Sequence, residues 1–121
     1  LPSPKIRYSD ANTYPFIEGY YSLEEWEKGD ELLQNYLQTL IEYIEYYLQF
    51  DGMQATLVGD IIQDKMDSLM ELYYLAAYAQ RAEIVGAMND YLRTFGYTDE
   101  ELIQPGTDPA EMIDASTIDM E

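Results

Sequence analysis

Two long stretches, in which apolar residues return every three or four positions, constrain the fold of this chain most. In the first stretch these residues are Leu33, Leu37, Leu40, Ile44 and Tyr47. Such spacing places them on one face of an α-helix. Ser22 and Glu25 before the stretch have capping-box spacing, which is typical of a helix start, and Asp51-Gly52 is typical of a helix end. The pattern predicts a helix over residues 23–50.

The second stretch begins near residues 55–56 and ends at Gly96. Its apolar positions are Ile62, Met66, Leu69, Tyr73, Ala76, Ile84, Met88, Tyr91 and Phe95. At ~1.5 Å per residue an unbroken helix of this length would span about 60 Å, which exceeds the width of a compact domain of this size. We therefore expect a break between Gln80 and Gly86. Thr98–Glu101 and Asp108-Pro109 predict two further helix starts.

The first 21 residues differ in composition from the rest of the chain. They contain Pro2, Pro4 and Pro15 among several tyrosines, and proline removes a hydrogen bond from a helix interior. We expect an extended aromatic arm over residues 1–21 and a single acidic helical domain over residues 22–121. No segment alternates polar and apolar residues as a strand does.

The expected fold is therefore all-α. It is a small bundle built on a long helical hairpin, with short C-terminal helices and the extended N-terminal arm. We expect a homodimer if the long helices leave apolar surface uncovered.

The charge of the chain restricts its partners. Asp and Glu number 24 against 6 Lys and Arg, which gives a net charge of −18. Nucleic acid, anionic membranes and free nucleotides repel such a field, so we expect none of them as a direct ligand. A basic protein is the natural partner.

The chain has no cysteine and no histidine. This excludes disulfides, thiolate nucleophiles, imidazole bases and common zinc sites. We expect a binding protein rather than an enzyme, with no cofactor and no metal. No run of about 18 apolar residues is present, and the N-terminus lacks the pattern of a signal peptide, which indicates a soluble cytoplasmic protein.

Acidic residues form two stripes at helical spacing, each opposite the apolar face of its helix. On the first helix they are Glu24, Glu27, Glu31, Glu42 and Glu45, and on the second they are Asp60, Asp64, Asp67 and Glu71. Solvated helix faces usually alternate Glu with Lys, because such pairs stabilise a helix and like charges destabilise it. Here only Lys28 and Lys65 interrupt the acids. The plain interpretation is a solvated face, but the missing bases favour a surface for an electrostatic partner.

Three of the 13 tyrosines fall near the acids in helical projection: Tyr46, Tyr74 and Tyr78. We expect them to be exposed and to contact the partner, because a tyrosine among acids can receive an arginine on its ring and at its hydroxyl. Tyr36, Tyr43, Tyr47, Tyr73 and Tyr91 are expected to complete the core instead.

These features favour an inhibitor that imitates nucleic acid and occupies the basic surface of a nuclease or another DNA- or RNA-processing protein. Anti-restriction, anti-CRISPR and nuclease-immunity proteins share its size, acidity and helical character, and a phage-encoded inhibitor would act in the host cytoplasm. The alternative is a viral structural or assembly protein, or a chaperone of a basic client.

A third hypothesis rests on two acidic pairs. Glu42-x-x-Glu45 and Asp64-x-x-Asp67 resemble the paired acidic motifs of all-α nucleoside triphosphate pyrophosphatases, whose helices direct such pairs at Mg²⁺. That resemblance implies a magnesium-dependent hydrolase. This chain has Asp in its second pair where the family has Glu, and its pairs are expected on outer faces.

Overall fold

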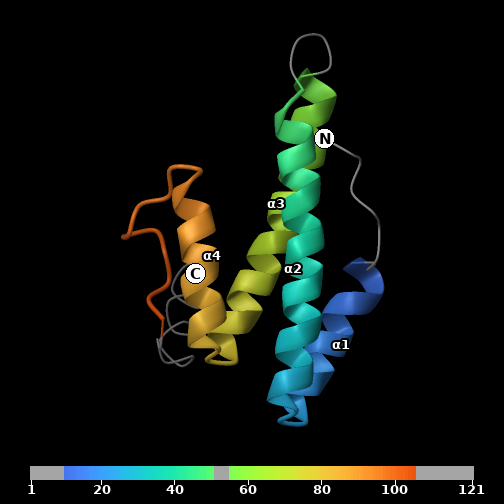
Figure 1. Cartoon of the computed structure of the whole chain (residues 1–121), viewed down its shortest axis with the longest axis vertical. Coiled ribbons are helices and arrows are strands. Elements are labelled where there is room, and N and C mark those ends of the chain that lie inside the picture. The colour runs from blue at the N-terminus through green and yellow to red at the C-terminus, as the bar shows by residue number, and fades with distance from the viewer. Residues whose placement is uncertain (1–9, 51–54, 106–121) are drawn as a thin grey trace, which may run out of the picture. The chain divides into compact units, whose positions relative to one another are not determined.

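The computed structural model describes residues 10–50 and 55–105, and all regular structure in these ranges is helical (Figure 1). The helices are α1 (Asp10–Ser22), α2 (Trp26–Leu48), α3 (Ala55–Tyr78) and α4 (Ala82–Arg93). The all-α prediction is confirmed, and so is the long helical hairpin, which α2 and α3 form. The chain divides within α3 into two compact units, Leu1–Leu72 and Tyr73–Glu121.

Helix α1 corrects one prediction. The segment expected to be an extended arm is helical from Asp10 to Ser22 with Pro15 inside the helix, and residues 1–9 lie outside the described part. Thr13, Ile17 and Tyr21 stand four residues apart and are all buried. Proline in a helix interior removes a hydrogen bond and destabilises the helix by about 3 kcal/mol. Burial of this face of α1 offsets that cost.

The connection between α1 and α2 corrects a second prediction. Ser22 does not cap the next helix, because α1 runs through it and its hydroxyl donates to the Glu18 carbonyl at 3.0 Å. The Glu25 amide donates to the Tyr20 carbonyl at 2.9 Å, and the Glu24 amide to the Tyr21 carbonyl at 3.0 Å. These two bonds define a Schellman motif. Helix α2 therefore starts at Trp26, not at residue 23.

Tyr21 joins α1 to α2. Its hydroxyl donates to Asp30 Oδ1 at 2.8 Å, and its ring centroid lies 5.9 Å from that of Trp26. Gly29 permits this approach, since a Cβ atom there would lie 2.6 Å from Tyr21 Cδ1. The absent side chain thus sets the spacing between the two helices.

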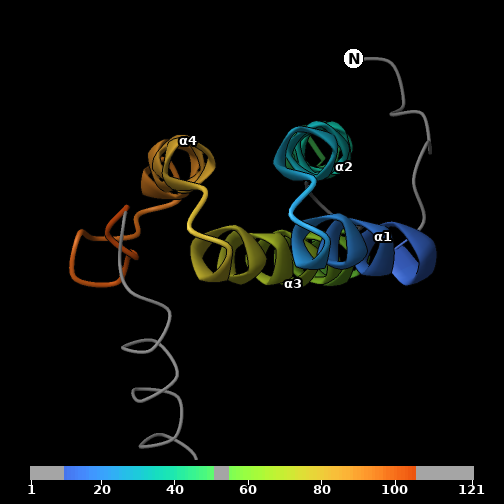
Figure 2. The ribbon, with the colours of Figure 1, turned by 90° about the horizontal axis from the view of Figure 1, so that it is seen from below.

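The core of the first unit lies between two layers of helices. Figure 2 shows α2 in one layer, and α1 with the part of α3 that belongs to this unit in the other. The buried apolar side chains of the unit are Ile17, Tyr21, Leu33, Tyr36, Leu40, Ile44, Val58, Leu69 and Leu72. Leu33, Leu40 and Ile44 belong to the apolar residues that the sequence spacing places on one face. Their burial confirms the face of α2 that the sequence assigns to the core.

The second unit begins in the last turns of α3. The predicted break falls at residues 79–81, between α3 and α4. The turn repeats the motif that follows α1: the Arg81 amide donates to the Ala76 carbonyl at 2.8 Å and the Gln80 amide to the Ala77 carbonyl at 3.0 Å. The apolar core of this unit comprises Tyr73, Leu75, Ala76, Ala77, Ile84, Val85, Met88, Leu92 and Leu102.

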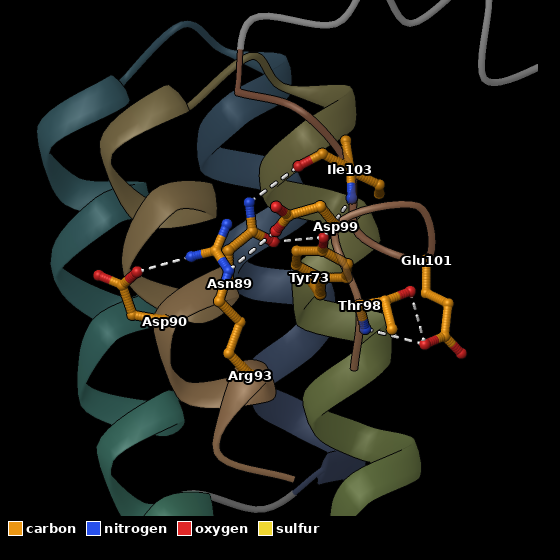
Figure 3. A network of polar contacts seen from close by, with 8 residues as sticks. All are labelled: Tyr73, Asn89, Asp90, Arg93, Thr98, Asp99, Glu101 and Ile103. Carbon is orange, nitrogen blue, oxygen red and sulfur yellow. Dashed lines mark hydrogen bonds and ion pairs between the residues drawn. The ribbon is translucent and has the colours of Figure 1, made fainter. Parts of the chain in front are cut away.

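A buried polar network holds the segment after α4 (Figure 3). The Tyr73 hydroxyl donates to Asn89 Oδ1 at 2.5 Å and accepts the Ile103 amide at 2.6 Å, while Asn89 Nδ2 donates to the Ile103 carbonyl at 2.9 Å. Each polar group thus has a partner, which buried groups require. Burial raises the pKa of Tyr73 above its ordinary value.

The same segment is fixed at the surface by Arg93. Its guanidinium contacts Asp90 at 2.8 Å and Asp99 at 3.1 Å (Figure 3). The predicted capping box at Thr98 forms its hydrogen bond, from the Thr98 amide to Glu101 Oε1 at 2.9 Å. Residues 99–105 nevertheless form turns rather than a helix, and the helix start predicted at Asp108-Pro109 lies outside the described residues. Within the described ranges, none of the helices is both long and apolar enough to cross a membrane.

Candidate acidic interaction surface

The acidic stripe of α2 is exposed along its length. Its members within the helix are Glu27, Glu31, Glu42 and Glu45. At 100° per residue they lie opposite Leu33, Leu40 and Ile44, which are buried. The structure therefore confirms their exposure, while their role in binding stays a prediction. Glu24, assigned to the same stripe, lies in the turn before the helix with φ 59°.

The acidic stripe of α3 is exposed as well, and it lies opposite Val58, Leu69 and Leu72. The stripe consists of Asp60, Asp64, Asp67 and Glu71. Asp64 contacts Lys65 at 3.6 Å, and Asp67 accepts a hydrogen bond from Gln63 at 2.8 Å.

The two stripes do not form one continuous surface. Lys65 of α3 places its Nζ atom 4.8 Å from the ring centroid of Tyr43 on α2. Both residues belong to the inward sides of their helices, so the two buried faces are turned toward each other. Each stripe is consequently turned away from the helix that carries the other.

The three tyrosines of the predicted site differ in their surroundings. Tyr74 and Tyr78 are 52% and 54% exposed, as expected, and they belong to the second unit. Tyr46 is half-buried, with its ring edge-on to those of Tyr47 and Phe50. The tyrosines expected in the core are Tyr36, Tyr43, Tyr47, Tyr73 and Tyr91, and each of them is buried or half-buried.

Positive charge is scarce near the stripes. No lysine or arginine occurs between Lys28 and Lys65 in the sequence. Lys28 itself contacts Glu25 at 3.1 Å, which lies outside the stripes. Each carboxylate in a stripe has another one helical turn away, about 5–6 Å between Cβ atoms. This arrangement produces negative potential on both outer sides of the unit and weakens the helices that carry it.

The acidic pairs that resemble magnesium motifs do not meet. Glu42 and Glu45 lie on the outer side of α2, and Asp64 and Asp67 on the outer side of α3. Among the residues that the structure describes, no group of three or more acidic side chains is placed to hold a metal ion. The geometry of these four residues therefore gives the pyrophosphatase hypothesis no support.

Sequence reasoning missed the exposed apolar side chains at the end of α2. Leu48 is 48% exposed and Phe50 is 42% exposed, although both continue the apolar pattern of the helix. Both follow the last buried residue of α2, Ile44, by more than a turn, and the sequence pattern carries no signal of this limit. A shallow groove of about 250 Å³ on the α1–α2 side was also not foreseen, and it is lined by Tyr20, Lys28, Glu31, Leu32 and Asn35.

No protein-family model matches this chain, and the comparisons with curated proteins and with solved structures give no match either.

Proposed function

We propose that this chain is an acidic binding protein that imitates nucleic acid and attaches to the basic surface of a nuclease or another DNA- or RNA-processing protein. One observation carries the proposal: the carboxylates of both stripes are exposed, and the 36-residue interval between Lys28 and Lys65, which contains five of them, holds no base. Selection for helix stability alone would keep bases on a solvated helix, because Glu–Lys pairs stabilise it.

Rows of carboxylates one helical turn apart resemble the row of phosphates along a nucleic-acid strand. A basic cleft built for phosphates therefore offers complementary charge to either stripe. Because each stripe is turned away from the helix that carries the other, two basic surfaces of a partner can be contacted at once. The long-range field accelerates association, and this acceleration falls as the salt concentration rises.

Capture from a cell lysate tests the proposal. The immobilised chain is expected to retain basic nucleic-acid-binding proteins at low salt, to release them at high salt, and to lose them to added duplex DNA. Replacement of Glu31, Glu42 and Glu45 by glutamine is expected to reduce retention at least about tenfold. A parallel variant of Asp60, Asp67 and Glu71 shows whether the α3 stripe contributes.

The matched control replaces Glu18, Glu83 and Glu100, three exposed acids outside the stripes, by glutamine. It has the same net charge as the α2 variant, so it separates a defined surface from general acidity. Equal retention by the α2 variant, the α3 variant and this control would contradict the proposal, and so would capture that is indifferent to salt and to DNA.

Exposed apolar side chains favour a second candidate function, a structural or assembly protein. Phe16 is 63% exposed, and Leu23 and Leu57 are also largely exposed, which is typical of surfaces that bind another protein. Analytical ultracentrifugation distinguishes the two candidates: a stable large homo-oligomer supports assembly, and a monomer or dimer supports the inhibitor.

A further inference from the structure

The last two turns of α2 and the residues that follow carry a cluster of four aromatic rings, from Tyr43, Tyr46, Tyr47 and Phe50. We refer to it as the aromatic end of α2. Tyr43 and Tyr47 stack with centroids 6.3 Å apart and an interplanar angle of 3°. Tyr46 lies edge-on to Tyr47 at 5.1 Å and to Phe50 at 5.2 Å. The rings hold one another in place.

The rings of this cluster are fixed by mutual contact and are partly exposed to solvent. Phe50 and the neighbouring Leu48 are exposed, and Tyr46 and Tyr47 are half-buried, so the cluster presents apolar area that the first unit does not use for its core. Because the rings are already fixed by mutual contact, little side-chain entropy is lost when a partner covers them. Rigid, partly exposed aromatic side chains of this kind dominate the binding energy of interfaces.

The electrostatics at this end of α2 favour a cation. Carbonyl groups at a helix C-terminus carry partial negative charge, and a basic residue in the last turn commonly balances it. The last turn of α2 contains no basic residue, and Glu42 and Glu45 on the same helix add full negative charges. Lys65 of the same chain already places its Nζ atom over the Tyr43 ring, so the rings left for a partner are those of Tyr46, Tyr47 and Phe50.

We propose that the aromatic end of α2 binds a cationic amphipathic helix of the basic partner. Its apolar side chains would cover Leu48, Tyr46 and Phe50. Its lysine or arginine side chains would reach Glu42, Glu45 and the C-terminal carbonyls of α2. The inference rests on the proposed function and names the kind of segment that the partner presents. A second copy of this chain is a poorer occupant, because its net charge of −18 would bring like charges together.

Fluorescence anisotropy with a labelled synthetic peptide tests this inference. The probe has leucine and lysine at helical spacing, and a second probe has glutamate in place of lysine. Measurements are made at low salt and at about 0.5 M salt, where the Debye length is about 4 Å and pure charge attraction is largely screened. We expect the lysine probe to bind at both salt concentrations, more weakly at high salt, and the glutamate probe not to bind at low salt, where repulsion is unscreened.

The decisive variant is Tyr46→Ala with Phe50→Ala, which leaves the charge unchanged and is expected to weaken binding of the lysine probe at least about tenfold at high salt. The matched control is Phe16→Ala, since Phe16 is an exposed aromatic residue of α1, and it is expected to bind as the wild type does. Circular dichroism verifies that both variants keep their helices. Leu48→Ala removes a single exposed side chain and serves as a second, milder variant.

Equal binding by the wild type and the Tyr46/Phe50 variant would overturn the inference. If the Glu31/Glu42/Glu45 variant then still lost binding, the acidic surface would stand without an aromatic anchor, so the two failures are distinguishable. A wild-type dimer in sedimentation that the Phe50 substitution dissociates would also overturn the inference, in favour of a second copy as the occupant.

Discussion

Gly29 is the residue whose substitution tests the packing of α1 on α2 most directly. An added Cβ would lie 2.6 Å from Tyr21 Cδ1, and the Tyr21 hydroxyl is tied to Asp30, so the ring cannot move without losing that hydrogen bond. Overpacking costs about 1–3 kcal/mol, whereas alanine gains about 1 kcal/mol over glycine in a helix. We expect Gly29→Ala to lower the free energy of unfolding by about 1 kcal/mol, measured by urea denaturation.

Gly59→Ala is the matched control for this prediction. Gly59 lies in α3, and no atom stands within 4 Å of its added Cβ. Only the gain in helix propensity remains there, and we expect the free energy of unfolding to rise by about 0.5–1 kcal/mol. Changes of the same sign in both variants would contradict the role assigned to the contact between Tyr21 and Gly29.

Tyr73 holds the second unit together through its hydroxyl. Tyr73→Phe leaves Asn89 Oδ1 and the Ile103 amide without their partner. A buried polar group that loses its hydrogen bond costs about 1–3 kcal/mol, so we expect a loss of that size in the free energy of unfolding. Hydrogen exchange of the Ile103 amide is expected to accelerate in the variant.

The neighbouring Tyr74 supplies the comparison. Its side chain is exposed, and exposed substitutions usually change stability by less than about 0.5 kcal/mol. Tyr74→Phe is therefore expected to leave both unfolding and Ile103 exchange almost unchanged. A Tyr73→Phe variant with wild-type exchange would show that the network does not secure residues 97–105.

At the scale of the elements, the turns after α1 and after α3 have the same backbone although their sequences differ. Glu24 and Gln80 both have φ 59°. The residues before the next helices, Glu25 and Arg81, have φ/ψ of −89°/70° and −87°/75°. Glycine is the common residue at such a left-handed position, because a side chain there is strained.

This strain predicts that replacing Gln80 by glycine stabilises the protein. We expect it to raise the free energy of unfolding by about 0.5–1 kcal/mol, because the left-handed conformation costs a non-glycine residue about 1–2 kcal/mol and the added chain entropy of glycine offsets part of the gain. Gln49→Gly is the matched control, since Gln49 has φ −79° and only the entropy cost applies. Thermal unfolding measures both. A gain in the control, or none at Gln80, would contradict the strain.

The sequence predicts elements well where one apolar face decides them. The core face of α2 and the all-helical class follow from the spacing of apolar residues, and the break after α3 follows from the length that an unbroken helix would have. Helix α1 was missed because Pro15 was given more weight than the four-residue spacing of Thr13, Ile17 and Tyr21. The capping-box pattern at Ser22 was misleading because Ser22 is the last residue of the preceding helix. A local sequence pattern does not show that this residue already belongs to another helix.

The candidate site shows a related limit. Exposure of each acidic stripe follows from its position opposite an apolar face, so the sequence predicts it helix by helix. The relation between the stripes depends on how α2 packs on α3, which helical projection of single helices cannot give. The contact of Lys65 with Tyr43 shows that neither stripe lies on the side of its helix that faces the other helix. The exposed end of α2 was missed for the same reason, because burial there depends on where the neighbouring helix lies.

At the scale of the whole molecule, the net charge of −18 opposes folding. Carboxylates at helical spacing repel one another in the folded chain more than in the expanded unfolded chain. Salt shortens the Debye length from about 30 Å at 0.01 M to about 10 Å at 0.1 M. Screening therefore relieves the folded state, and we expect the free energy of unfolding to rise with sodium chloride over this range, measured by urea denaturation at each concentration.

The glutamine variant of the α2 stripe tests whether the acidic stripes cause this dependence of stability on salt. If the stripes supply much of the repulsion, the Glu31/Glu42/Glu45 glutamine variant is more stable than the wild type at low salt and gains less from added salt. The control at Glu18, Glu83 and Glu100, with the same net charge, is expected to show a smaller change, because these three acids are far apart in sequence. A wild type that salt destabilises would mean that ion pairs such as Arg93–Asp90 outweigh repulsion. The acidic stripes would then lack the stability cost that indicates selection for a basic partner.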